Sequence, residues 1–333
     1  MISNRKIDFL GDQLKRDNDL TPVEFEELLK WRNDYSNDLD YYFNKLKTKL
    51  DQDTTIILAR RLKRIESIQI KLKRFSTMRL STLQDIAGVR AVFTNGIALN
   101  MAYVKLRGLS SKHKLKRLDN YHDYPKDDGY RGMHIVYQTG EMKLIEIQLR
   151  TELEHIWATA VETYGELQNT SFKTGEGNQD WKEFFSLLSS YFAIKENCAP
   201  GKAHEKLSDL QIRAHLKKKI RKLKVIERLN ATTNTIQIII NKQNELGRKG
   251  RIALLELDTK TKTTTIDIYN KKDINKAIEV YTHKELSLKN SDHKNIVLVN
   301  IENIEKIQES YPNYFLNTQK LLQILSKIML DQF

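Results

Sequence analysis

The sequence predicts an α/β (α+β) protein with a mixed sheet flanked by helices, followed by a C-terminal α+β domain. Three observations predict this class. Helix-like periodicity dominates residues 1–80, strand-like and helix-like segments alternate irregularly up to about 165, and strand-like segments return after 233. Because the alternation is irregular, a mixed sheet is favoured over a regular βαβ series.

The N-terminal elements are predicted to be helices. Residues 21–50 begin with a threonine cap, a proline at the first helical position and acidic residues in the first turn. A second helix is predicted over 54–76. Apolar residues recur every three or four positions in the first of these segments, as expected for a helix with one buried face.

The central segment supplies the predicted strands of the first domain. Strands are expected at 88–94, 134–139 and 143–151, and helices at 96–109 and 152–167. In the last strand three aliphatic residues alternate with Glu146, Gln148 and Arg150. Since a strand sends alternate side chains to opposite faces, an anion, an amide and a cation should share one face.

The C-terminal half should begin with a loop and continue with helices and strands. Residues 166–180 are rich in glycine, asparagine, threonine and glutamine, which is typical of a loop or lid. The remaining segments are expected to be helices at 180–196, 210–231, 273–286 and 317–330, and strands at 235–242, 252–258, 263–270 and 295–301. We therefore predict a first domain over 1–200, a basic linker helix over 201–232 and a second domain over 233–333.

The composition limits which classes of binding partner and which cellular compartment are expected. The net charge is +13 and the pI about 9.4, which favours polyanionic partners, although a lysine-rich composition fits an ordinary soluble protein equally well. Cys198 is the single cysteine, so neither a disulfide framework nor a cysteine-based zinc site is expected, which suits a reducing compartment. No apolar run approaches the ~18 residues that span a bilayer. We expect a cytoplasmic protein without a membrane partner.

Two stretches carry residues suited to a polyphosphate and a metal. In "RLKRIESIQIKLKR", Lys63, Ser67 and Lys71 are four apart and should share a helix face. Taken alone, such a run more often means a solvated basic face. In "LQDIAGVRAVF", Asp85 precedes a strand that contains Arg90. A carboxylate at a strand end can bind magnesium together with substrate phosphates, but a lone aspartate is more often a cap.

A third stretch, "DYPKDDGYRGMH", combines a turn with several side chains suited to nucleotide binding. An exposed tyrosine can stack on a base, and cationic side chains can hold phosphates. The side chains are Tyr124, Lys126, Tyr130, Arg131 and His134. The sequence has neither a Walker A motif nor GxGxxG, so a nucleotide would be held by side chains.

These three stretches and "IEIQLRTELEHIWA" occur in the same order in the synthetase domain of the RelA/SpoT homologue family. Over about 55–165 the chain resembles synthetase-only members, the small alarmone synthetases and their toxic relatives. The resemblance implies a nucleotidyltransferase-like synthetase domain within 1–200, without the family's hydrolase domain. Residues 233–333 do not resemble the regulatory domains of long members. They are expected to form an extra domain, for which a regulatory role is one interpretation.

The resemblance also implies roles for single residues. Arg61 and Arg90 would sandwich the adenine of ATP, and its phosphates would be held by Lys63, Ser67 and Lys71. Asp85 and Glu146 would bind Mg²⁺, with Glu146 also activating the acceptor 3′-hydroxyl. Tyr130 would stack on the acceptor base. The acceptor and phosphate site would be completed by Lys126, Arg131, His134, Gln148 and Arg150.

The implied enzyme is a pyrophosphokinase that transfers pyrophosphate from ATP to GDP or GTP, making (p)ppGpp. The alternative is a toxin that modifies the 3′ end of tRNA, with the C-terminal domain as sensor or self-inhibitor. The basic runs 105–117 and 217–224 would suit tRNA. Asp128, the pair Gly132 and Met133, and the end of the following helix depart from the family pattern, which leaves the acceptor open. The sequence also leaves the oligomeric state open, and a homo-oligomer is among the states compatible with it.

Overall fold

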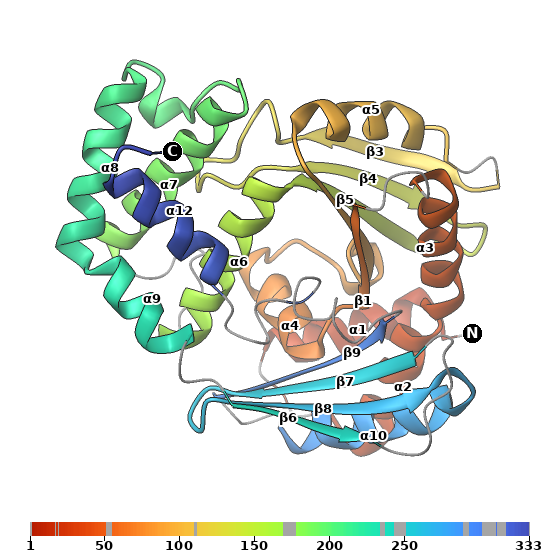
Figure 1. Ribbon diagram of the computed structural model, residues 1–333. Helices are drawn as coiled ribbons and strands as arrows, with labels where there is room; N and C mark the ends of the chain where they lie inside the picture. Colours follow the sequence, from red (N-terminus) through yellow and green to blue (C-terminus); the bar gives the residue numbers. More distant parts are fainter. Residues whose placement is uncertain are drawn as a thin grey trace.

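The computed structural model describes residues 2–16, 18, 20–50, 55–109, 112–168, 178–233, 237–242, 251–288, 293–301, 311 and 318–332. Its strands form one nine-stranded sheet in the order β3-β4-β5-β2-β1-β9-β7-β8-β6 (Figure 1). Two pairs, β2 with β5 and β6 with β8, are parallel, and the other pairs are antiparallel. The predicted mixed α/β class is therefore confirmed.

The strands are β1 Ile57–Leu62, β2 Ala87–Phe93, β3 Lys114–Asn120, β4 Met133–Gln138, β5 Leu144–Thr151, β6 Gln237–Lys242, β7 Arg251–Asp258, β8 Thr263–Asn270 and β9 Lys294–Ile301. The α-helices are α1 Asn4–Lys15, α2 Pro22–Asn33, α3 Ser36–Leu50, α4 Ile65–Arg74, α5 Gly96–Leu106, α6 Glu152–Gln168, α7 Gln179–Lys195, α8 Asp209–Leu223, α9 Val225–Thr233, α10 Ile274–Ser287 and α12 Gln319–Met329.

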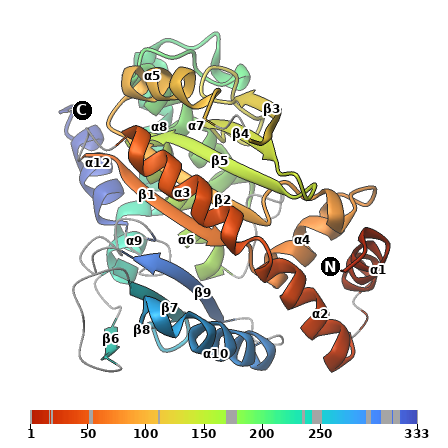
Figure 2. The same cartoon turned by 90° about the vertical axis from the view of Figure 1, so that its right-hand side faces the viewer.

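One face of the N-terminal part of the sheet is a closed hydrophobic core. Ile145, Ile147 and Leu149 of β5 are fully buried there, together with apolar residues of α3 and α5. Figure 2 shows α3 lying across β1 and β2. The predicted alternation in β5 is confirmed, so its Glu146, Gln148 and Arg150 face the other side of the sheet.

A second core joins helices that are far apart in the sequence. Apolar residues of α6, α7, α8, α9 and the C-terminal helix α12 pack together in it. Figure 1 shows these helices grouped at one end of the molecule. Arg61 of β1 also pairs with Val299 of β9, so the C-terminal strands extend the N-terminal sheet. The division into 1–200, 201–232 and 233–333 stays a prediction.

Several predicted boundaries were wrong. The helix expected over 54–76 begins only at Ile65, because Ile57–Leu62 pairs along its whole length with β2. Backbone pairing with a neighbouring strand overrides a weak helical preference. The basic run at 105–117 begins at the end of α5 and ends in β3, a strand that was not predicted.

Two long predicted helices are each divided into two. Residues 21–50 form α2 and α3, and 210–231 divide at Lys224, whose φ of 50° is left-handed. Of the loop predicted over 166–180, residues 169–177 lie outside the described residues. Within the described part of the chain, the helices lack the length and apolar character needed to cross a bilayer.

Candidate active site

The floor of the candidate site is the polar face of β5 and its neighbours. Arg90 of β2 pairs with Gln148 of β5, and Gly88 pairs with Glu146. On the other side of β5, His134 of β4 pairs with Gln148. Paired residues point to the same face of a sheet, so these side chains from three strands lie side by side.

Five of the predicted residues form a closed ring of hydrogen bonds. Glu146 Oε1 lies 2.9 Å from His134 Nδ1, and His134 Nε2 lies 2.6 Å from the Tyr130 hydroxyl. Arg150 donates to that hydroxyl at 3.1 Å and to Gln148 Oε1 at 3.4 Å. Gln148 Nε2 closes the ring by donating to Glu146 Oε2 at 2.6 Å. Such a network fixes each side chain through its neighbours.

The ring shifts the acidity of its members. Burial opposes protonation of His134, but the Tyr130 hydroxyl and the Glu146 carboxylate raise its pKa to about 9. Burial opposes ionisation of Tyr130, yet Arg150 and His134 lower its pKa to about 8. Burial would also keep Glu146 neutral, but its contact with His134 leaves the pKa below the ordinary value. Glu146 is therefore an anion at neutral pH and can accept a proton.

Asp85 lies between two of the predicted phosphate ligands. Its Oδ2 is 2.9 Å from Lys63 Nζ, and its Oδ1 is 2.9 Å from Lys71 Nζ. Burial opposes ionisation of Asp85, but the two ammonium groups hold its pKa well below the usual range. Ser67 lies half-buried on α4, on the same segment as Lys71.

Asp85 and Glu146 form a ligand set that fits a magnesium ion. The negative charge of Asp85 raises the pKa of Glu146 against the lowering effect of His134, so the two carboxylates interact. Magnesium is bound in proteins through one or two carboxylates plus substrate phosphates. Lys63 and Lys71 now neutralise Asp85, and a polyphosphate would offer these lysines an alternative anion.

The predicted adenine arginines also share the polar face. Arg61 of β1 pairs with Gly88, and Arg90 lies two residues further along β2, so both point to the same side. Burial and the charge of Arg150 lower the pKa of Arg90 to about 10, and Arg61 contributes as well. The positive charges of Arg61 and Arg150 both act on Arg90, and such a group of cations favours an anionic ligand.

The loop before β4 is the predicted turn. Asp128 Oδ1 accepts from the Tyr130 backbone N–H at 2.9 Å, and Gly129 has a φ of 90°. Lys126 Nζ lies 5.0 Å from the centre of the Tyr130 ring. An exposed tyrosine was expected, but Tyr130 is only 9% exposed, whereas Tyr124 is 77% exposed. Tyr130 is buried because its ring packs against Trp157 of α6.

Arg131 has a different environment from the ring. It donates to the backbone carbonyls of His122 at 2.6 Å and Ala199 at 2.5 Å, and is 4% exposed. These contacts tie the loop before β4 to the end of α7. Because the Arg131 guanidinium donates to two backbone carbonyls, its main role in this structure is to position the loop. The residue type alone could not reveal this role.

The sequence did not predict one contact beside the proposed adenine arginines. The Tyr311 hydroxyl accepts from the Arg60 N–H at 3.1 Å and donates to the Arg60 carbonyl at 2.7 Å. Tyr311 is buried, and the charges of Arg90 and Arg61 act on its pKa. It belongs to the aromatic segment 309–318, of which the structure describes residues 311 and 318. Because Tyr311 lies 251 residues from Arg60 in the sequence, only its aromatic character could have indicated this contact.

Comparison with known proteins identifies the segment that carries this site. Residues 60–169 match the family model described as a region found in RelA / SpoT proteins. Over these residues the chain resembles RelA/SpoT proteins, and the resemblance seen in the motifs is confirmed. No curated protein matches the chain.

Solved structures resemble about half of the chain. The small alarmone synthetase 1 from Bacillus subtilis bound to its product pppGpp is 23% identical, with a TM-score of 0.42, over 49% of this chain and 89% of that one. The small alarmone synthetase 2 from the same organism is 19% identical, with a TM-score of 0.43, over 52% and 95%. A GTP pyrophosphokinase family protein from Streptococcus pneumoniae is 22% identical, with a TM-score of 0.43, over 57% and 96%.

Proposed function

We propose that the protein is an ATP-dependent pyrophosphokinase that transfers the β,γ-pyrophosphate of ATP to the 3′-hydroxyl of GDP or GTP, making (p)ppGpp. The observation that carries the proposal is the environment of Glu146 on the polar face of the sheet. Its carboxylate is held by His134 and Gln148, and the charge of Asp85 acts on its pKa. Such a transfer asks the protein for positioning and charge neutralisation rather than for a covalent intermediate.

On the donor side, Arg61 and Arg90 hold the adenine, and Lys63, Ser67 and Lys71 hold the phosphates. When ATP binds, Lys63 and Lys71 would exchange their ion pairs with Asp85 for ion pairs with the phosphates. The Asp85 carboxylate would then be available to bind Mg²⁺. When bound by Asp85 and Glu146, that ion would neutralise phosphate charge and polarise the phosphorus that is attacked. The chain supplies this charge from side chains because the sequence has no glycine-rich phosphate loop.

On the acceptor side, Glu146 takes the proton of the 3′-hydroxyl. His134 holds the carboxylate by one oxygen and Gln148 by the other, so its orientation is set before the acceptor arrives. Arg150 and Lys126 supply positive charge beside Tyr130. Arg131 fixes the loop that carries these groups.

The direct test is transfer of label. The protein is incubated with Mg²⁺ and ATP labelled in the γ-phosphate, together with GDP, GTP, ADP or bulk tRNA in separate reactions. We expect labelled (p)ppGpp with GDP or GTP. Labelled tRNA with no labelled guanosine nucleotide would replace the acceptor, and no transfer to any acceptor would refute the pyrophosphokinase.

Tyr130→Ala should weaken acceptor binding by about 1–3 kcal/mol, the usual contribution of an aromatic ring that stacks on a base. Tyr130→Phe keeps the ring and removes the hydroxyl between His134 and Arg150. We therefore expect acceptor KM to rise in the alanine variant far more than in the phenylalanine variant, with KM for ATP unchanged in both. A rise in KM for ATP equal to that for the acceptor would contradict the stacking role.

Tyr124→Ala is the control for this prediction, because Tyr124 is the exposed aromatic of the same loop. It should leave both KM values unchanged. If only Tyr124→Ala raises the acceptor KM, the base stacks on Tyr124 instead. Because Tyr130→Ala removes a ring that contacts Trp157, near-ultraviolet circular dichroism checks that the remaining aromatic side chains of this core stay ordered.

The basic helix α8 bears on the tRNA alternative. Lys219 pairs with Asp180 and Glu183, and Lys217 lies 2.6 Å from Asp331, so part of its charge is neutralised within the chain. A free guanosine nucleotide needs no cationic track outside the pocket, whereas tRNA does. The partial neutralisation supports the smaller acceptor.

Replacing the exposed Lys218 and Arg221 of α8 and its C-cap Lys224 with glutamine should therefore leave synthesis of (p)ppGpp unchanged. If tRNA is the acceptor, the same variant should label tRNA more weakly, and its salt dependence should be shallower. A triple glutamine variant of the exposed Lys45, Lys47 and Lys49 on α3 controls for net charge. Comparing the two variants at several salt concentrations separates the hypotheses.

The C-terminal domain is proposed as a self-inhibitor of the ATP side. Tyr311 supports this, because it bonds to the Arg60 backbone beside Arg61 on β1 and lies near Arg90. Tyr311→Ala should then raise the basal rate and lower KM for ATP. Tyr311→Phe, which keeps the ring but loses both hydrogen bonds, should give a smaller rise. A fall in rate in both variants would instead indicate that Tyr311 supports the fold of β1.

A further inference from the structure

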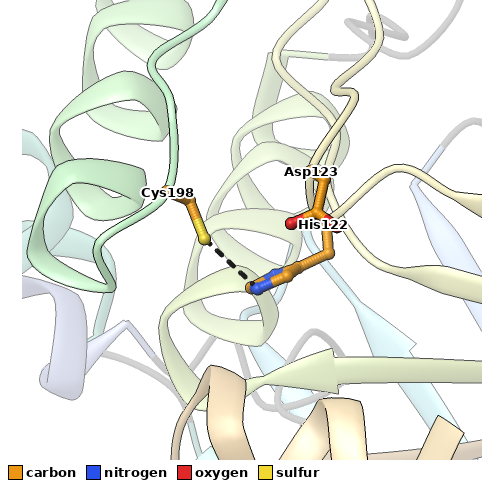
Figure 3. A group of neighbouring side chains, drawn as sticks. All are labelled: His122, Asp123 and Cys198. Atoms are coloured by element: carbon orange, nitrogen blue, oxygen red, sulfur yellow. Dashed lines mark hydrogen bonds between the residues drawn. The ribbon is translucent and has the colours of Figure 1, made fainter. Parts of the chain in front are cut away.

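A cluster of unlike ligand groups lies at the end of the candidate site's loop, outside the ring described above. His122 and Asp123 come from the loop between β3 and β4, and Cys198 follows α7. One ligand atom of each lies within 4.8 Å of the others. Figure 3 shows Cys198 facing His122 across the gap between the two segments, with Asp123 beside it.

The ring of His122 is oriented as a metal-binding imidazole usually is. Its Nδ1 lies 2.7 Å from Glu154 Oε1, and its Nε2 faces the Cys198 sulfur at 3.2 Å. A carboxylate on one ring nitrogen fixes the tautomer and directs the other nitrogen to a metal. Glu154 is itself held, since its Oε2 accepts from the Thr151 N–H at 2.8 Å.

Burial of the three ligands suits a site that is built but can be reached. His122 is 2% exposed, Cys198 is half-buried and Asp123 is exposed. Asp123 is also oriented, because its Oδ2 accepts from the Asn120 amide at 2.7 Å. An ion could therefore enter from the Asp123 side and keep a water ligand there.

The charges around the cluster favour a divalent cation. The carboxylates of Asp123, Glu154 and Glu196 all have an oxygen within 4.8 Å of a His122 ring nitrogen. The Arg131 guanidinium donates to the His122 carbonyl. Ionisation of the thiol on metal binding would add a further negative charge. The thiolate and the Asp123 carboxylate, the two anionic ligands, would together balance a cation of charge two.

We propose that His122 Nε2, the Cys198 thiolate and the Asp123 carboxylate form a zinc site, with water as the fourth ligand and Glu154 behind the imidazole. Thiolate and imidazole together select zinc over magnesium, which prefers oxygen ligands. This site differs from the cysteine-based zinc sites that were not expected, because nitrogen and oxygen ligands complete the set around a single thiolate. The inference is independent of the pyrophosphokinase proposal.

The site would join two segments on either side of the turn between β3 and β4. His122 and Asp123 precede the turn with Lys126 and Tyr130, while Cys198 follows the helix against which this turn packs. Ser189 of α7 donates to the Gly129 carbonyl at 2.5 Å, so the turn and the helix already touch. Zinc would hold the two segments together from a second point.

Cobalt substitution tests the ligands without any activity measurement. The purified full chain is stripped with a chelator, titrated with Co²⁺ and followed by absorbance, and then titrated with Zn²⁺. We expect one Co²⁺ per chain, a near-ultraviolet thiolate-to-cobalt band, visible bands of tetrahedral cobalt, and loss of all bands on adding one equivalent of Zn²⁺. The charge-transfer band must come from Cys198, the single cysteine.

Variants assign the remaining ligands. Cys198→Ser should abolish the charge-transfer band, and Asp123→Asn should weaken Zn²⁺ binding in competition with a chromophoric chelator. Glu154→Gln should weaken it by about 10–100-fold, the usual effect of losing a group behind a ligand. Asp127→Asn, an exposed aspartate in the same loop, is the matched control and should change nothing.

Three results would overturn the site: Co²⁺ spectra without a thiolate band, Zn²⁺ affinity in Cys198→Ser and Asp123→Asn equal to that of the parent, or equal losses in Asp127→Asn and Asp123→Asn. Far-ultraviolet circular dichroism of each stripped variant shows whether it is folded. Thermal unfolding adds a second readout, because a ligand that binds only the folded chain raises Tm. We expect Zn²⁺ to raise Tm of the parent and not of Cys198→Ser.

Discussion

Asp85→Asn and Glu146→Gln should each lower the rate of pyrophosphate transfer by about 100-fold to 10,000-fold, the range for losing a positioned proton-transfer group or a comparable charge. Glu146→Gln removes the group that takes the acceptor proton. Asp85→Asn removes half of the carboxylate pair that fits magnesium. Initial rates at saturating ATP, acceptor and Mg²⁺ measure both effects.

Amide variants are preferable to alanine here because both carboxylates are paired. Asp85 contacts the ammonium groups of Lys63 and Lys71, and Glu146 contacts His134. Truncation would leave buried groups without partners and would confuse lost catalysis with lost folding. Glu141→Gln, on an exposed carboxylate in the turn between β4 and β5, is the control and should keep the parent rate.

Mg²⁺ titration distinguishes the two carboxylates. Asp85→Asn should need more Mg²⁺ for half of its remaining activity, because it removes a proposed ligand without removing the base. Glu146→Gln should stay slow at any Mg²⁺ concentration. If either variant retains more than a tenth of the parent rate, its carboxylate does not have the role proposed for it.

The polar floor of the site could be predicted because strand alternation depends only on local sequence. Glu146, Gln148 and Arg150 had to share a face once β5 was recognised as a strand. The closed ring through His134 and Tyr130 could not be predicted, since it depends on the register between β4 and β5. Register follows from packing of the whole sheet.

Other parts of the fold were beyond sequence reasoning for related reasons. Ile57–Leu62 contains two arginines and precedes a helix, so nothing local distinguishes it from the first turns of that helix. Its strand state is fixed by pairing with β2. The contact of Tyr311 with Arg60 joins the C-terminal segment to β1, and no short-range pattern reports such a contact.

Glu285→Ala should lower the free energy of unfolding by about 3–5 kcal/mol, the cost of removing one partner of a buried ion pair. Arg32 of α2 is fully buried, and its Nη1 lies 2.9 Å from Glu285 Oε2 on α10. The Tyr281 hydroxyl accepts from the same nitrogen at 3.3 Å, too weak a contact to replace a carboxylate. The variant would leave the guanidinium charge buried without its counter-ion.

The same carboxylate links the C-terminal part of the chain to the proposed phosphate site. Glu285 Oε1 accepts from the Ile65 N–H at 3.0 Å, at the first residue of α4. A negative charge there stabilises a helix by satisfying a free N–H and opposing the helix dipole. Because α4 carries Ser67 and Lys71, Glu285→Ala should also raise KM for ATP.

Urea unfolding followed by tryptophan fluorescence measures the loss, with Glu279→Ala, an exposed glutamate of the same helix, as the control. The double variant Arg32→Met with Glu285→Leu should be more stable than Glu285→Ala alone, since removing both charges leaves no buried ion without a partner. A loss below about 1 kcal/mol for Glu285→Ala, the value for an exposed pair, would mean that water reaches Arg32. A double variant less stable than Glu285→Ala would mean that the pair stabilises the chain beyond the cost of leaving one charge alone.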